Sequence, residues 1–91
     1  MHIEFDPFKN ETNIRDRGLS FERAANFDFE TAAFKQDTRR EYGEIRLRAL
    51  GYLDGRMHAL VFTETAKGIR VISFRKANKR EVLTYEQETQ S

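Results

Sequence analysis

The residues of this chain that are best suited to chemistry are basic, and they concentrate in its middle part. Residues 38–80 carry eleven Lys and Arg against four Asp and Glu, a net charge of +7. Residues 1–37 and residues 81–91 each carry a net charge of −3, so the 91-residue chain has a net charge of only +1. A basic surface binds phosphates because each phosphate that it neutralises releases condensed counterions, although a basic stretch can equally be a solvated face.

Composition removes most other classes of site. Without cysteine there is no disulfide framework, no thiolate zinc site and no catalytic thiol. The two histidines are too few for a histidine-rich metal centre, and the five glycines are too isolated for a phosphate-binding loop. There is no apolar run near 18 residues and no signal-peptide pattern. We therefore expect a cytoplasmic protein with one domain over residues 1–91, without membrane contact, metal or other cofactor.

Metal-free cleavage of RNA is the reaction that remains. RNA supplies its own nucleophile, the 2′-hydroxyl, so an enzyme has only to align it with a phosphate, remove one proton and neutralise the developing charge. Arginine and lysine suit the last task because their donors match phosphate oxygens. The candidates for binding phosphate are Arg46, Arg48, Arg70, Arg75, Lys76, Lys79 and Arg80.

Four side chains are candidates for the proton acceptor, and three of them have an obvious structural alternative. Glu81 fits a helix capping box, and a buried, hydrogen-bonded His58 is as compatible with its strand as a catalytic one. Tyr85 shares a helix face with an apolar residue and can simply pack there. Glu44 is the fourth candidate, and the residue types alone leave the choice open.

Two helices are predicted before the basic segment. Asp6-Pro7 is a typical helix start, and this first helix should end near Arg17 because Gly18 follows it. Ser20 then caps a second helix, whose apolar residues recur at helical spacing and should face the core.

The basic segment predicts a three-stranded antiparallel meander. Ile45, Leu47 and Ala49 alternate with Arg46 and Arg48, which places the two arginines on one face of a half-buried strand. Asp-Gly turn residues then lead into a return strand, and a second turn leads into a third strand. The return strand should place Met57, Ala59 and Val61 on one face and His58, Leu60 and Phe62 on the other. The segments are the turn at 53–56, the strand at 57–63, the turn around 67–68, the strand at 69–75, and short flanking strands at 2–5 and near 28–34.

A last helix follows the meander. Asn78 and Glu81 stand three residues apart, which is typical of a capping box at a helix start. The basic pairs Arg75-Lys76 and Lys79-Arg80 frame this helix N-terminus, which adds a partial positive charge. The order of a helix pair, an antiparallel meander and a final helix indicates an α+β fold. These patterns alone predict a small α+β domain with a basic, anion-binding sheet.

Several short motifs also stand in a fixed order along the chain. The opening contains Phe5-Asp6-Pro7-Phe8-Lys9 and Gly18-Leu19-Ser20-Phe21-Glu22. The middle contains Asp37-Thr38-Arg39 and Tyr42-Gly43-Glu44-Ile45-Arg46. The most specific part is Arg70-Val71-Ile72-Ser73-Phe74-Arg75-Lys76-Ala77, followed by Asn78-Lys79-Arg80-Glu81 and Tyr85-Glu86. In these motifs, over nearly its whole length, the chain resembles the BrnT toxin family.

The resemblance implies a fold, an activity and a partner. It implies a RelE-like fold and a metal-independent endoribonuclease toxin of a type II toxin–antitoxin pair, which cleaves RNA to inhibit translation and growth. The implied partner is a BrnA-type antitoxin with a ribbon-helix-helix DNA-binding domain, in an assembly of two toxins and two antitoxins. Together the two proteins would repress their own operon, and operator DNA would be bound only through the antitoxin.

The resemblance points to candidate site residues at the family's polar positions, which are Arg46, Arg75, Lys76, Lys79, Arg80, Glu81, Tyr85 and Lys9. Together with the residues singled out above, they give the following roles. Arg46, Arg75 and Arg80 are expected to bind and stabilise phosphate, while Tyr85 or His58 handles protons. Further contacts to RNA are expected from Lys9, Arg48, Arg70, Lys76 and Lys79.

Two departures from the family pattern support an alternative function. Phe5 stands where family members often have Trp, and Asp16-Arg17 replaces a Lys-His pair. The alternative is a catalytically weak or inactive module that binds the antitoxin and acts mainly as a co-repressor.

Overall fold

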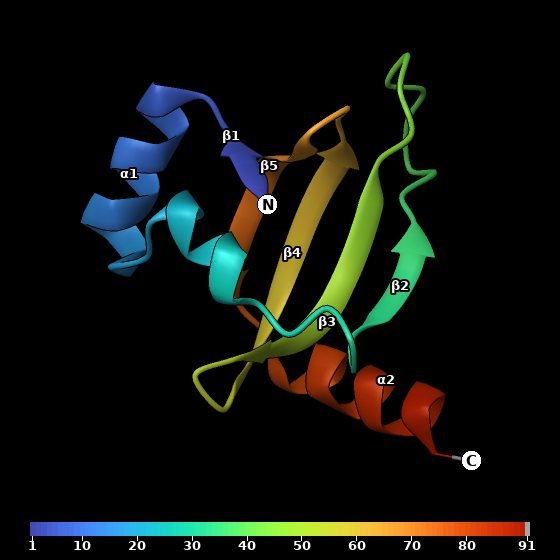
Figure 1. The fold of residues 1–91 in the computed structure, drawn as a ribbon. Coiled ribbons are helices and arrows are strands. Elements are labelled where there is room, and N and C mark those ends of the chain that lie inside the picture. The colour runs from blue at the N-terminus through green and yellow to red at the C-terminus, as the bar shows by residue number, and fades with distance from the viewer. Residues whose placement is uncertain (91) are drawn as a thin grey trace.

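The computed structural model describes residues 1–90 and has an α+β fold with a five-stranded mixed sheet (Figure 1). The sheet order is β1-β5-β4-β3-β2, with β1 parallel to β5 and the other neighbours antiparallel. The elements in chain order are β1 (His2–Glu4), α1 (Pro7–Arg17), the 3₁₀ helix η1 (Phe21–Asn26), β2 (Ala33–Gln36), β3 (Leu47–Leu53), β4 (Arg56–Glu64), β5 (Gly68–Lys76) and α2 (Lys79–Thr89).

The predicted meander is confirmed in strands β3, β4 and β5, but three expectations need correction. The segment after Ser20 forms a 3₁₀ helix, because its buried residues Phe21 and Ala24 stand three apart and eclipse at three residues per turn. Strand β3 begins at Leu47 rather than at Ile45, whose side chain is 65% exposed. The sheet is mixed because β1 pairs in parallel with the start of β5.

The first face of the sheet carries the main core. Leu60 and Phe62 of β4 lie on this face, as the predicted alternation requires, and pack with Phe74 of β5. The segment around η1 covers them with Phe21 and Phe27. This face is therefore closed to ligands.

The second face is covered only in part. Helix α2 packs a small cluster of Met57, Ala77 and Tyr85 against one end of it. Figure 1 shows α2 crossing that end of the sheet, near β3 and β2. The rest of this face, including Arg48 and Arg75, remains open for a site.

Helix α1 is attached through polar contacts and has no buried residue. Asp6 caps its start and Gly18, with φ 65°, ends it, as the sequence predicts. The Asn13 amide donates to the carbonyl oxygens of Leu19 and Phe74, both at 2.9 Å. These bonds fix α1 beside the β1–β5 edge of the sheet (Figure 1).

Candidate functional site

A cleft of about 440 Å³ lies between the second face of the sheet and α2. Its floor includes small or apolar residues of the central strands, among them Ala59 and Val61. Its acidic residues are Asp37, Glu81 and Glu88, and its basic residues are Lys35, Arg39, Arg46, Arg48, Arg75 and Arg80. The basic residues outnumber the acidic ones, so the cleft suits an anion.

Strand register places two of these arginines on either side of β4. Arg48 of β3 lies opposite Val61, and Arg75 of β5 lies opposite Ala59. Two strand spacings separate β3 from β5, which is about 10 Å. Ala59 and Val61 form the floor between these strands, and both guanidinium groups reach the Glu81 carboxylate.

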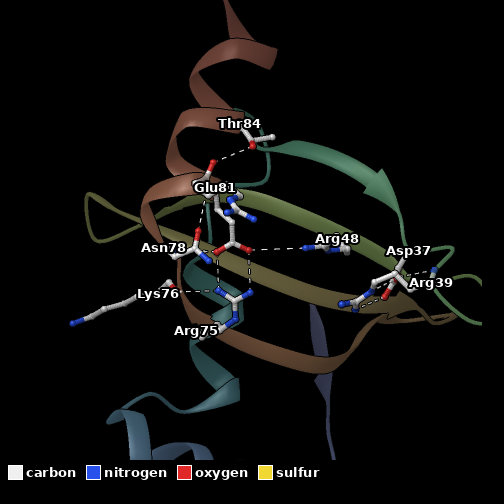
Figure 2. Close-up of polar contacts among 9 residues, drawn as sticks. Asp37, Arg39, Arg48, Arg75, Lys76, Asn78, Glu81 and Thr84 are labelled. Atoms are coloured by element: carbon white, nitrogen blue, oxygen red, sulfur yellow. Dashed lines mark hydrogen bonds and ion pairs between the residues drawn. The ribbon is translucent and has the colours of Figure 1, made fainter.

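Glu81 of α2 binds both of these arginines (Figure 2). Arg75 donates from Nη1 to Oε1 at 2.8 Å and from Nη2 to Oε2 at 2.9 Å, while Arg48 Nη2 lies 3.9 Å from Oε2. The Asn78 backbone N–H also donates to Glu81, which completes the predicted capping box. The hydrogen bonds from Arg75 hold the pKa of Glu81 below its usual range, and they raise that of Arg75.

The loop between β2 and β3 forms the opposite rim of the cleft. Asp37, whose side chain is only 1% exposed, accepts two hydrogen bonds from the Arg39 guanidinium, both at 2.8 Å. The Tyr42 hydroxyl donates to the same carboxylate at 3.1 Å. These bonds, that from Arg39 above all, lower the pKa of Asp37 despite its desolvation. The guanidinium carbon of Arg46 stacks 4.1 Å from the centre of the Tyr42 ring.

The cleft gathers four of the predicted phosphate-binding residues, Arg46, Arg48, Arg75 and Arg80. Among the cleft arginines of residues 1–90, only Arg80 forms no ion pair. The other predicted residues do not line this cleft. Arg70 pairs with Glu44 at 2.7 Å, Lys76 and Lys79 are exposed beside α2, and Lys9 lines a separate groove along α1.

The predicted proton carriers Tyr85 and His58 are both buried, and neither lines the cleft. The Tyr85 hydroxyl donates to the carbonyl oxygen of Thr31 at 2.8 Å. His58 lies on the core face, with Nδ1 2.7 Å from the carbonyl oxygen of Arg56. Both side chains thus have the structural surroundings that the sequence analysis gave as their alternative.

Two cleft residues escaped the sequence analysis. Lys35 lies on β2, opposite Arg48, but so short an edge strand has little periodic signal. Arg39 lies in the loop after β2, where no alternation applies. Its spacing from Asp37 in the motif Asp37-Thr38-Arg39 was the one available signal, because side chains two apart in a turn can pair.

Within residues 1–90, no helix has the length and apolarity needed to cross a membrane. No three His, Cys, Asp or Glu side chains of this part of the chain form a group suited to a metal ion. The chemistry at hand in the cleft is that of basic donors beside three carboxylates. Asp37 is buried, Glu81 is partly exposed and pairs with Arg75, and Glu88 is exposed on α2.

Comparison with known proteins adds one finding. A family model described as "Ribonuclease toxin, BrnT, of type II toxin-antitoxin system" matches residues 5–81. A search of curated proteins gives no match. The matched range includes Arg46, Arg48, Arg75, Arg80 and Glu81 of the cleft, and it ends before Tyr85.

Proposed function

The chain belongs to the BrnT family of ribonuclease toxins of type II toxin–antitoxin systems, and from this premise we propose that the arginine-lined cleft is where it cleaves RNA. The observation that carries the proposal is the convergence of Arg46, Arg48, Arg75 and Arg80 on one cleft. Guanidinium groups bind phosphate oxygens in pairs and stabilise the extra negative charge of a pentacovalent phosphorus.

The proposed reaction uses the RNA 2′-hydroxyl as the nucleophile and needs no metal ion. The 2′-oxygen attacks the adjacent phosphorus, and the 5′-oxygen of the next nucleotide leaves with a proton from solvent. The products are a 2′,3′-cyclic phosphate and a 5′-hydroxyl. The arginines supply the positive charge that this step requires.

Glu81 is the proposed acceptor of the 2′-hydroxyl proton. It lies in the cleft beside Arg75 and Arg48, and because its pKa is lowered it is ionised at neutral pH. Tyr85 and His58 have no part in this proposal, since both side chains are buried and neither lines the cleft.

The partner of a type II toxin is a protein antitoxin. We propose that this partner is a BrnA-type antitoxin with a ribbon-helix-helix domain. Two toxins and two antitoxins form a cytoplasmic complex, which represses the operon that encodes them. We also propose that residues 1–91 form one RelE-like domain. The resemblance of the sequence motifs supports these assignments.

The direct test is cleavage of RNA by the purified protein in the presence of EDTA. We expect a cyclic phosphate product and a rate about 10² to 10³ lower in Arg80→Gln. Glu81→Gln should lower the rate by about 10² to 10⁴ while keeping the capping box, because glutamine also accepts from the Asn78 N–H. Since the hydrogen bonds from Arg75 lower the pKa of Glu81, the wild-type rate should hold on acidification as far as the ordinary glutamate pKa of about 4.3.

Arg56→Gln is the matched control, because this exposed arginine does not line the cleft. Full activity of both Arg80→Gln and Glu81→Gln would show that the cleft is not the site of cleavage. Expression of the wild type alone should arrest growth, with rescue by the antitoxin. Normal growth with a soluble, folded protein would instead favour the co-repressor.

A further inference from the structure

A second, open groove runs along α1 at the edge of the sheet. It is lined by Phe8, Lys9, Thr12, Asn13, Asp16, Arg17 and Phe21 on one side and by Ile72 and Ser73 of β5 on the other. Strand β1 ends at Glu4, opposite Arg70, so it leaves this part of the β5 edge uncovered. The groove therefore lies where no strand pairs with the edge of β5, and Asn13 of α1 donates to the Phe74 carbonyl oxygen there.

The groove and the cleft meet at one irregularity of β5. Ile72 and Ser73 line both of them. Ser73 pairs with Val61 and Val71 pairs with Phe62, so Ile72 is the extra residue of a β-bulge. Bulges turn side chains and bend a strand edge, and here the bulge joins the two surfaces. Arg75, two residues beyond Ser73, belongs to the cleft.

The side chains of the groove suit a single-stranded nucleic acid. The Phe8 side chain is 80% exposed, although it is a large aromatic residue with no structural need to face water. Lys9 stands beside it and Arg17 lies farther along α1, and within the described residues neither forms an ion pair. The one carboxylate of the groove, Asp16, is paired with Arg15 at 3.0 Å. Exposed aromatic rings in a groove that also carries cations are the usual platform on which such strands stack a base.

We propose that this groove is a second RNA subsite, continuous with the cleft, in which Phe8 stacks on a base and Lys9 and Arg17 hold phosphates. The strand passes from Arg75 over the bulge at Ile72-Ser73 to α1. This inference rests on the proposed function, because the cleft supplies the first contacts. Charge favours RNA over a protein partner here, since Lys9 and Arg17 form no ion pair within the described residues while Asp16 is already paired with Arg15.

Length dependence of RNA binding tests the proposal. Fluorescence anisotropy with non-cleavable 2′-fluoro RNA compares a trinucleotide, which fills the cleft, with a dodecanucleotide, which reaches the groove. Phe8→Ala should lower the affinity for the dodecanucleotide by about 5- to 150-fold and leave the affinity for the trinucleotide unchanged. Phe8→Tyr should restore binding because it keeps the ring. Ile14→Ala is the control, as Ile14 is exposed on α1 outside the groove.

Lys9→Gln and Arg17→Gln give a second reading that does not depend on Phe8. Each should weaken only the dodecanucleotide and reduce the slope of log K against log salt by about 0.7. Lys67→Gln, an exposed lysine outside both surfaces, should change neither. All of these residues are exposed, so the variants should melt like the wild type.

The outcomes separate the two proposals. Unchanged dodecanucleotide binding in Phe8→Ala, Lys9→Gln and Arg17→Gln would overturn the subsite, as would equal losses for both RNA lengths. Loss of antitoxin affinity with intact RNA affinity would also overturn it, because the groove would then bind protein. If Arg48→Gln and Arg80→Gln bind the trinucleotide normally, it is the cleft proposal that fails.

Discussion

Three carboxylates determine how the arginines of the cleft are held. Asp37 fixes Arg39, Glu81 fixes Arg75, and Glu44 holds Arg46 at 3.2 Å. Each of these guanidinium groups has lost some rotational freedom before any phosphate arrives. Arg80 has no such restraint within the described chain, so its substitution tests phosphate binding without leaving a buried carboxylate unpaired.

The pH dependence of stability should reveal the role of Asp37. Its pKa is lowered in the folded protein, so its contribution is fully present above the ordinary aspartate pKa near 4 and is lost as the pH falls further. Asp37→Asn should therefore lower the melting temperature at pH 7, and the difference from the wild type should shrink below pH 4. Thermal melts followed by circular dichroism from pH 7 to pH 2 measure this difference.

The control for that series is Asp54→Asn. Asp54 pairs with Arg23 at 2.6 Å, but its side chain is 70% exposed, and exposed pairs contribute little to stability. If the difference in melting temperature between the wild type and Asp37→Asn stays constant down to pH 2, the charge of this carboxylate does not contribute to stability.

At the scale of elements, the sequence predicted those helix ends and strands whose formation depends on residues close together in the chain. The caps at Asp6, Gly18 and Asn78 and the alternation in β4 each depend on residues a few positions apart. The parallel pairing of β1 with β5 joins distant segments, and no local pattern encodes it.

The candidate site followed the same division. Alternation brought Arg46 and Arg48 together, and the capping box placed Glu81 beside the basic entry to α2. Contacts between distant segments decided the rest. Tyr85 is turned away from the cleft by its bond to Thr31, and Lys35 enters the cleft because β2 pairs with β3. Neither contact leaves a signal in its own segment.

The attachment of α1 gives a prediction for that element. Because α1 buries no residue, hydrogen bonds to other segments hold it in place, two from the Asn13 amide and one that Asn10 accepts from the Phe21 backbone N–H. The Asn13 amide is the link to β5. Asn13→Ala should speed amide exchange throughout α1 while the exchange of β4 stays near that of the wild type. Asn26→Ala, at an exposed position in η1, serves as the control in the same exchange experiment. Equal acceleration in α1 and β4 would mean that Asn13 supports the whole fold.

At the scale of the whole molecule, the separation of charge matters more than its sum. The net charge is +1, yet the cleft concentrates basic residues on one open face. RNA binding should therefore depend steeply on salt, as expected of a far more basic protein. Arg80→Gln should lower the slope of log K against log salt by about 0.7, whereas Arg56→Gln should leave it unchanged. Titrations from low to high salt measure both slopes, and equal slopes in all three proteins would argue against a local phosphate site.

The pairing of β1 with β5 also bears on the order in which the protein is built. His2 pairs with Gly68, so β1 leaves the ribosome long before its partner strand has been synthesised. The β3–β4 hairpin, closed by the turn at Asp54 and Gly55, joins neighbouring residues and can form early. The groove beside α1 likewise needs β5, which is translated well after α1. Strand β1 is thus translated before the other strands of the sheet and is among the last to reach its native position.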